Sequence, residues 1–348
     1  MPYYWLVKIF RHVICIMDVK REKGMIRFLL LGLFVLVVGT DLTGQPVPAE
    51  DENIPYLMTF GGGGKRETSW GDDDFCQIFF FEIPESYTEP FYIRVFDPDC
   101  GGEVDEINGE WDTRTSFSIY GGKECHSHPD ARETQPEGNY NSGTLLASKT
   151  FGNNRRYDNN WYTFGPFNPS EGEFDPRYGY IFKIITKGEA GDDGNLYRYY
   201  LSTSEDDNLS IEGANAFTYE YSFRMWNDPN NVSHIYPYID ERVVSVKQEN
   251  FDWDNDGFIR VVSIARQGLS VKRSGEDLWI DDEFKILDEE LNTSLDFQFI
   301  KSQNPVVRNN NVVISVRNQY GELIKFYAIP IGGVPKYKYD IGVQKIEK

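Results

Sequence analysis

The sequence has few histidines, few cysteines and few basic residues for its length. Of its 348 residues only 4 are histidine and 4 are cysteine, and 35 Lys and Arg stand against 55 Asp and Glu, a formal net charge of -20. So acidic a chain repels nucleic-acid phosphates and anionic membranes, so neither is expected as a direct partner. Divalent cations, cationic partners and neutral glycans remain compatible with this charge.

Signatures of common enzymes are also scarce. The sequence has no G-x-S-x-G and no H-E-x-x-H, and the only histidines after residue 44 are His126, His128 and His234. Serine hydrolases and histidine-based zinc hydrolases therefore have few possible bases. The many Asp and Glu residues permit a glycosidase-type carboxylate pair, but their abundance is no evidence for one. The sequence predicts a protein that is not an enzyme, with a secreted hydrolase as the weakest alternative.

Residues 1–44 have the pattern of a secretory signal peptide. Basic residues from Lys20 to Arg27 precede the apolar run FLLLGLFVLVV, and a stretch of small and polar residues, GTDLTGQ, follows it. The run is too short to span a bilayer comfortably, so no transmembrane span is expected in the mature chain. We expect export to the periplasm, the outer-membrane surface or the medium. Met17 and Met25 are alternative start sites.

After residue 45 the chain alternates like β-strands rather than helices. Short runs rich in Val, Ile, Phe and Tyr recur between clusters of Gly, Asn, Asp and Pro. This predicts an all-β fold of two consecutive antiparallel β-sandwich domains. The turn-rich stretch MWNDPNNVSH places the boundary between a first domain, 45–232, and a second, immunoglobulin-like domain, 233–335, followed by a tail, 336–348. The strand candidates are 77–83, 91–96, 115–120, 144–151, 161–164, 178–186, 197–202, 217–225, 243–247, 258–265, 278–280, 295–300, 312–317 and 323–329.

An acidic loop, VFDPDCGGEVDEINGEWDT, follows one strand candidate. It offers Asp97, Asp99 and Asp105 as oxygen ligands, with two glycines that permit a sharp turn. Calcium takes six to eight oxygen ligands, so such a loop is a candidate calcium site. Its DPDCGGEVD segment locally resembles the calcium loops of synaptotagmin-type β-sandwiches. A solvated turn, which Pro98 also suits, is the alternative.

A second acidic turn, FDWDNDGFI, has better-spaced carboxylates. Asp252, Asp254 and Asp256 precede a glycine as in an EF-hand loop, and Phe258 would supply a backbone carbonyl. The glutamate that closes an EF-hand is missing, because Ser263 lies near that place, and the flanks resemble strands. The turn is therefore a candidate calcium site of another kind or a plain Asp-Gly hairpin turn.

Three cysteines follow the predicted signal peptide. In an oxidising compartment this odd number predicts one disulfide and one free thiol. Cys76 lies in a strand candidate, whereas Cys100 and Cys125 lie in loops that flank another strand candidate. A Cys100–Cys125 bridge is the preferred pairing, with Cys76 as a competing partner for either.

Aromatic residues gather in NNWYTFGPFNP and RYGYIFK. Most must belong to the cores, but sugar-binding modules stack pyranose rings on exposed aromatic faces. Trp161, which follows two asparagines, is the candidate for carbohydrate stacking.

The segment MTFGGGGKRETSWGDDDFCQIFFFEIPESYTEPFYIRVFDPDCGGEVDE, with WDTRTSFSIYGG after it, resembles the exported β-sandwich region of Gram-negative envelope proteins found upstream of OmpA-like domains. The resemblance implies an envelope protein that binds a protein or glycan ligand. The sequence thus predicts a secreted, calcium-stabilised β-sandwich protein with a binding, adhesion or structural role, or alternatively a carbohydrate-binding module.

Overall fold

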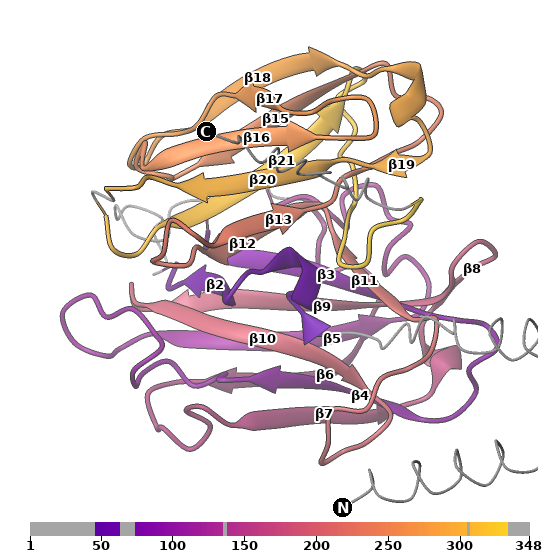
Figure 1. Ribbon diagram of the computed structural model, residues 1–348. Coiled ribbons are helices and arrows are strands. Elements are labelled where there is room, and N and C mark those ends of the chain that lie inside the picture. Colours follow the sequence, from indigo (N-terminus) through magenta and orange to yellow (C-terminus); the bar gives the residue numbers. More distant parts are fainter. Residues whose placement is uncertain (1–45, 63–73, 135–137, 305–306, 333–348) are drawn as a thin grey trace, which may run out of the picture. The chain divides into compact units, whose positions relative to one another are not determined.

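The computed structural model describes residues 46–62, 74–134, 138–304 and 307–332 (Figure 1). These residues all belong to one compact unit. The predicted signal peptide, 1–44, and the predicted tail, 336–348, lie outside the described residues. Within the described ranges, no helix combines the length and the apolar character needed to cross a membrane.

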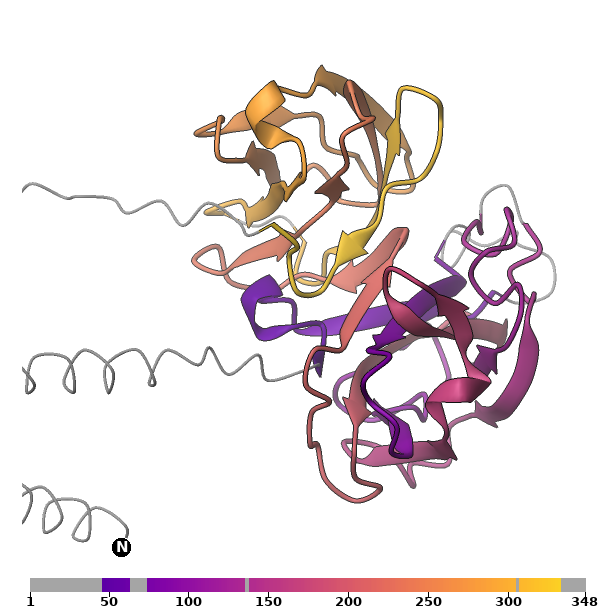
Figure 2. The same cartoon turned by 90° about the vertical axis from the view of Figure 1, so that its right-hand side faces the viewer.

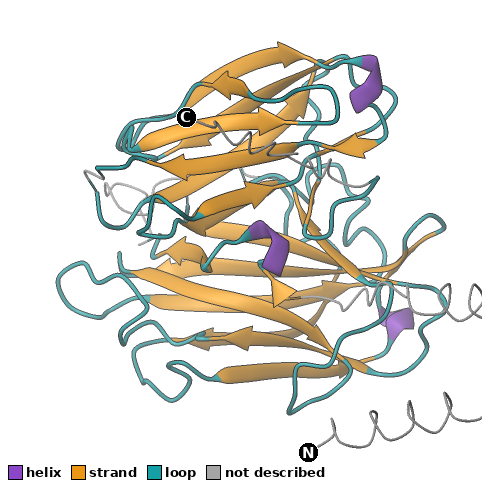
Figure 3. Ribbon diagram, viewed as in Figure 1, coloured by secondary structure: helices purple, strands orange, loops and turns teal. Residues whose placement is uncertain are grey.

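Strands dominate the described chain, and its helices are three single 3-10 turns (Figure 3). The prediction of an all-β fold is confirmed, and the strand pairings among the described residues are antiparallel. The strands are β1 (Pro46–Val47), β2 (Tyr56–Phe60), β3 (Cys76–Ile83), β4 (Phe91–Phe96), β5 (Arg114–Gly121), β6 (Thr144–Phe151), β7 (Trp161–Phe167), β8 (Glu173–Asp175), β9 (Gly179–Ala190), β10 (Gly194–Ser202), β11 (Asn215–Thr218), β12 (Glu220–Arg224), β13 (Val232–Ile235), β14 (Tyr238–Ile239), β15 (Ser245–Phe251), β16 (Gly257–Val262), β17 (Leu269–Val271), β18 (Ile280–Lys285), β19 (Thr293–Ser294), β20 (Asp296–Lys301), β21 (Asn311–Asn318) and β22 (Phe326–Tyr327). The 3-10 turns are η1 (Glu50–Glu52), η2 (Pro169–Glu171) and η3 (Asp288–Glu290).

Three sheets form the layers of the structure. The largest has the order β18-β15-β21-β12-β2-β10-β4-β7, with β1 beside β10. A second has the order β22-β11-β3-β9-β5-β6, with β8 beside β9, and a third the order β13-β20-β16-β17. Strands β14 and β19 form a separate pair.

One face of the largest sheet packs against both other sheets. Phe79 of β3 meets Tyr199 of β10 edge to face, with ring centroids 5.7 Å apart. Farther along the same sheet, Phe223 of β12 meets Phe299 of β20 at 5.1 Å. Side chains from all three sheets therefore join in one hydrophobic core. Truncating Phe79, which is 1% exposed, to alanine should destabilise this core by about 3–5 kcal/mol.

Strand pairing continues across residue 232, where the sequence predicted a domain boundary. Strand β12 pairs with β21 in the largest sheet, and β11 pairs with β22 in the second. In Figure 2 the C-terminal residues, in yellow, run from the strands of one sandwich to those of the other. The largest sheet thus belongs to two sandwiches, one with the second sheet and one with the third, and the two sandwiches share a core. The domain boundary near residue 232 stays a prediction.

Strand β3 is buried on both faces, which positions the site described below. Phe79 and Phe81 point into the main core, whereas Ile78 and Phe80 belong to a second apolar cluster. In that cluster Phe80 stacks on Phe217 of β11, with ring centroids 5.0 Å apart. The second sheet therefore carries aromatic side chains on its outer face as well.

Candidate functional site

The acidic loop after β4 is tied to the loop that precedes β7. Asp97 leaves the strand with a φ of 57°, and its Oδ1 accepts a hydrogen bond of 2.9 Å from the Asn159 backbone N–H. Asp99 Oδ2 accepts one of 2.6 Å from the Tyr157 N–H. The antiparallel pairing of β4 with β7 brings these loops together, since Phe96 lies opposite Trp161.

Four side-chain oxygens around this junction are buried and have no hydrogen-bond partner. They are Asp97 Oδ2, Asp99 Oδ1, Asp158 Oδ1 and Asn195 Oδ1. Asn195, on β10, donates its Nδ2–H to the Pro98 carbonyl at 3.0 Å, which places it against the acidic loop. Buried polar atoms without a partner are costly and rare, so these oxygens are candidates for contact with water or with a cation.

The electrostatics of the junction favour a cation. Burial raises the pKa of Asp97 to about 7, and the charges of Asp158 and Asp99 add to this rise. Burial and the charge of Asp158 also raise the pKa of Asp99. No ion pair to these three carboxylates is present within the described ranges. A bound cation would remove the repulsion among them.

Asp105, the third predicted ligand of this loop, has a structural task. Its Oδ1 accepts a hydrogen bond from the Leu196 N–H and its Oδ2 one from the Gly101 N–H, both at 2.7 Å. Both oxygens are thus already used. Asp158, which the sequence prediction missed, carries one of the unpartnered oxygens. Only the pairing of β4 with β7 would have revealed it, because single-sequence patterns do not show which loops meet.

The carboxylates are not drawn together into a finished metal site. In the part of the chain that the structure describes, no three His, Cys, Asp or Glu side chains have a metal-binding arrangement. Binding an ion here would therefore need movement of the Asp side chains, together with the Asn195 oxygen or backbone carbonyls. Calcium, with its flexible coordination by oxygen, tolerates such a mixed ligand set.

The second predicted calcium loop, between β15 and β16, is more fully paired. Asp252 Oδ1 accepts from the Asp277 N–H at 3.1 Å, and Asp254 Oδ2 from Asn310 Nδ2 at 3.0 Å. Asp256 Oδ2 accepts from the Val307 N–H at 3.1 Å and lies 3.9 Å from Lys301 Nζ.

A buried ammonium thus stands beside Asp256, although Asp256 Oδ1 and Asn310 Oδ1 stay without partners. Phe258, the predicted carbonyl ligand, lies in β16 opposite Ile300. This loop is the weaker of the two cation candidates because Lys301 already supplies positive charge.

The predicted Cys100–Cys125 disulfide is wrong for this structure, in which Cys76, Cys100 and Cys125 are buried and form no disulfide with one another. Strand β5 has eight residues and separates the two loops by about 26 Å. Cys100 lies near the start of β5, where its N–H bonds to Gly152 O, and Cys125 lies just past its end, where its N–H bonds to Gly122 O. A disulfide needs Cα atoms within about 7 Å, so this pairing is out of reach.

Trp161, the predicted carbohydrate-stacking residue, is half-buried and lines a pocket of about 490 Å³ together with Trp226 and Tyr200. The Arg94 guanidinium lies over the Trp161 ring at 5.1 Å, so one face of the ring is occupied. The Trp161 ring also contacts Phe96, with ring centroids 5.3 Å apart. A sugar would meet the rim of this pocket rather than an open tryptophan face.

A larger pocket lies on the outer face of the second sheet, beneath the loop between β5 and β6. This loop is held by Glu173 of β8, whose carboxylate accepts hydrogen bonds from the N–H groups of Glu124, His126 and Ser127 and from the Ser127 hydroxyl. Burial pushes the pKa of Glu173 upward, but these hydrogen bonds outweigh it and lower the pKa. Lys183 Nζ holds the far end of the loop through Ser142 O, at 2.8 Å.

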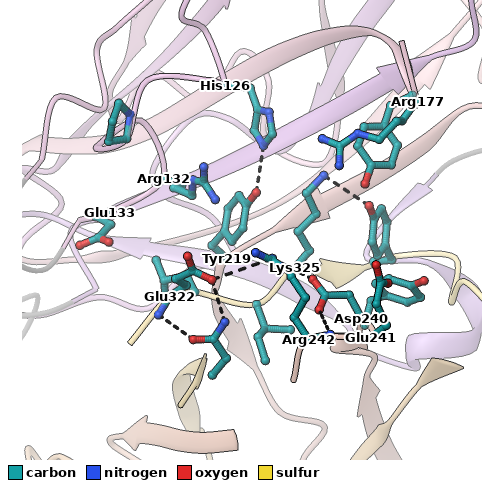
Figure 4. A pocket seen from close by; sticks show the side chains of 17 residues that line it. His126, Arg132, Glu133, Arg177, Tyr219, Asp240, Glu241, Arg242, Glu322 and Lys325 are labelled. Atoms are coloured by element: carbon teal, nitrogen blue, oxygen red, sulfur yellow. Dashed lines mark hydrogen bonds and ion pairs between the residues drawn. The ribbon is translucent and has the colours of Figure 1, made fainter. Parts of the chain in front are cut away.

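The pocket has a volume of about 790 Å³ and a mixed lining of cations, carboxylates and aromatic rings (Figure 4). His126 Nε2 and the Tyr219 hydroxyl are hydrogen-bonded at 2.9 Å. Burial, together with the charges of Lys325 and Arg132, lowers the pKa of His126 to about 3, so the imidazole is neutral. His126, in the segment ECHSHPD between β5 and β6, belongs to the pocket lining. The sequence did not reveal this pocket, because its residues come from segments far apart in the chain: His126, Pro129, Arg132, Glu133, Arg177, Tyr178, Tyr219, Tyr238, Asp240, Glu241, Arg242, Asn318, Glu322, Leu323, Ile324, Lys325 and Tyr327.

Comparison with known proteins assigns no family. No family model matches the chain, and no curated protein matches it. Among solved structures, the CUB1-EGF-CUB2 domain of human MASP-1/3 is 8% identical and aligns over 75% of this chain and 99% of that chain, with a TM-score of 0.19. A TM-score this low carries no conclusion about the function of this chain.

Proposed function

We propose that this protein is an exported, non-catalytic β-sandwich binding protein that calcium stabilises at the junction of Asp97, Asp99 and Asp158. The observation that carries the calcium part is the group of buried, unpartnered oxygens there, to which Asn195 adds a neutral fourth. Export is supported by the signal-peptide pattern of residues 1–44. The absence of common catalytic motifs supports a role without catalysis.

Thermal unfolding with and without calcium tests the ion. Exported calcium modules bind with Kd values of about 0.1–1 mM, so 10 mM calcium reaches 10 to 100 times Kd. At the upper end, binding stabilises the native state by about 2.7 kcal/mol, which should raise Tm by about 5 °C for a chain of this size. We expect this rise with calcium, a return on adding chelator, and a much smaller effect of magnesium.

Two matched variants locate the effect. Asp99→Asn should abolish most of the calcium-dependent rise, because it removes one buried ligand charge. Asp288→Asn, on the exposed face of η3, should leave the rise unchanged. If Asp254→Asn rather than Asp99→Asn removes the rise, the ion binds at the second loop. No rise for the unmodified protein at 10 mM calcium rejects the calcium part altogether.

A carbohydrate-binding module is the second candidate, because Trp161 and Trp226 line the same pocket. A glycan array should then show binding to neutral saccharides that Trp161→Ala abolishes. Trp279→Ala is a suitable control, since Trp279 is 38% exposed and does not line this pocket. Equal binding by the unmodified protein and by Trp161→Ala would remove Trp161 from the candidates.

A further inference from the structure

The cations of the larger pocket are incompletely paired with carboxylates. Arg177 is paired with Asp175 at 3.1 Å, and Lys325 Nζ lies 3.5 Å from Glu82 Oε1. Arg132 has no carboxylate partner among the described residues, and its Nε is buried without any hydrogen-bond partner. Its guanidinium lies instead over the Tyr219 ring, at 4.9 Å (Figure 4).

Positive charge prevails around Tyr219 in a chain that is strongly acidic overall. The charges of Lys325, Arg132 and Arg177 all act on His126, and only Asp175 opposes them among its main neighbours. Burial and the repulsion of two arginines lower the pKa of Lys325, and Glu82 acts against them. One more negative group would balance this part of the pocket.

The other side of the pocket carries acceptors. Asp240, Glu241 and Glu322 line it, and Arg242 is paired with Asp240 at 3.0 Å and lies 3.9 Å from Glu322. Carboxylates of this kind accept hydrogen bonds from ligand hydroxyls. The Tyr238 ring adds an apolar face to the lining, whereas the Tyr178 ring lies under the Lys325 ammonium and the Arg177 guanidinium, at 4.2 and 5.0 Å. The volume of about 790 Å³ is within the usual range for small-molecule sites.

We propose that this pocket binds a saccharide that bears a carboxylate, with the carboxylate on the Arg132 guanidinium and the sugar hydroxyls on the opposite acidic side. An Arg fork matches a carboxylate in two parallel hydrogen bonds. This inference rests on the proposed binding role, but it does not depend on the calcium site.

A peptide with a free C-terminus also carries a carboxylate, but the rest of the pocket favours a sugar. Peptide recognition in extended form uses an exposed sheet edge or apolar side-chain pockets. Here the lining outside the cations consists mainly of carboxylates and tyrosines, which suit a ligand rich in hydroxyl groups. Sugar-binding sites stack such ligands on aromatic faces.

Titration calorimetry with two matched disaccharides tests the proposal. Cellobiouronic acid and cellobiose differ only in a carboxylate in place of a hydroxymethyl group. We expect the full chain to bind the acid at least about 10-fold more tightly than the neutral sugar, because a hydrogen bond between charged groups strengthens binding by about this factor. Arg132→Gln should weaken binding of the acid by about 10- to 100-fold and leave binding of cellobiose unchanged. Arg132→Lys should restore only part of the affinity, because it keeps the charge and loses the fork.

Controls separate this site from loss of fold and from the calcium site. Arg114→Gln, at an exposed position in β5, should bind like the unmodified protein, and all variants should keep their Tm within a few degrees. The acid should bind equally in calcium and in chelator. Failure of the calcium-dependent Tm rise with intact binding of the acid would reject the calcium proposal alone.

Equal affinity for both disaccharides, or an unchanged affinity in Arg132→Gln, would overturn the inference. An acetylated dipeptide with a free C-terminus, compared with its amide, forms the last arm of the test. If this peptide binds through Arg132 and cellobiouronic acid does not, the pocket is a peptide-carboxylate site and the saccharide proposal is wrong.

Discussion

Removing the Glu173 carboxylate should loosen the loop that covers the larger pocket. In Glu173→Ala, the N–H groups of Glu124, His126 and Ser127 lose an ionised acceptor, which is 2.6 Å from the His126 nitrogen. Hydrogen bonds to charged groups contribute about 1.5–3 kcal/mol each. Glu124 and Ser127 are exposed and can bond to water instead, so only the bond to buried His126 should be lost at full cost. We expect a loss of about 2–3 kcal/mol in the free energy of unfolding.

Urea denaturation at pH 7 measures this loss as a lower midpoint with an unchanged slope. The same variant should bind cellobiouronic acid more weakly, because His126 and Arg132 belong to the loop that Glu173 holds. Glu212→Ala, at an exposed turn, is the matched control and should change neither quantity. The pKa of Glu173 is lowered in the folded state, so its contribution is present above its unfolded pKa and disappears as the pH falls through its folded pKa. A loss below about 0.5 kcal/mol, or the same loss at pH 3 as at pH 7, would refute this reasoning.

Three further predictions concern groups elsewhere in the chain. Because burial raises the pKa of Asp97 to about 7, the ion-free protein should lose stability as the pH rises from about 4, near the unfolded pKa, to about 7. Calcium should raise Tm more at pH 8 than at pH 5, because it binds the ionised carboxylate. An equal rise at both pH values, or no difference from Asp97→Asn, would contradict this. The three buried thiols should react with a thiol reagent only after denaturation, because burial shields them and raises the pKa of Cys125 to about 12 and that of Cys100 as well. A disulfide-linked pair of peptides that contain Cys100 and Cys125, found in a non-reducing digest, would contradict the structure. Lys183→Met should cost about 1–3 kcal/mol in urea denaturation, because Ser142 O loses its ammonium donor, and a variant as stable as the original would show that the bond contributes nothing.

Much of the strand pattern could be predicted from the sequence. Residues 91–96 and 144–151 are strands with the predicted bounds, because alternation and turn residues mark both ends. The predicted strand 217–225 is in fact two strands, β11 and β12, interrupted at Tyr219. Alternation continues through this interruption, since Tyr219 stays buried and bonds to His126. Side-chain periodicity alone therefore does not show where a strand passes from one sheet to another.

The candidate sites were less accessible to sequence reasoning. Asp97 and Asp99 were predicted because they are close in sequence, but Asp158 and Asn195 reach the same junction only through the pairing of β4 with β7 and β10. The predicted disulfide failed for another reason: the sequence already indicated a strand between Cys100 and Cys125, and its eight extended residues hold the two loops about 26 Å apart. No local sequence pattern indicated a role for Arg132. Its proposed role rests on its contact with the Tyr219 ring and on the lack of a carboxylate partner among the described residues, and only the three-dimensional structure shows these.

The pairing of β21 with β12 and of β22 with β11 has a consequence for how the chain reaches its native state. Each of the two large sheets includes a strand from near residue 320. Strands β12 and β11 therefore each keep an unpaired edge until the last tenth of the described chain is available for pairing. Contacts between residues this far apart in sequence form slowly, and unpaired edges invite association with other chains. A chain exported as this one is proposed to be would need protection from aggregation until its C-terminal strands arrive, and a fragment ending near residue 232 should be prone to self-association.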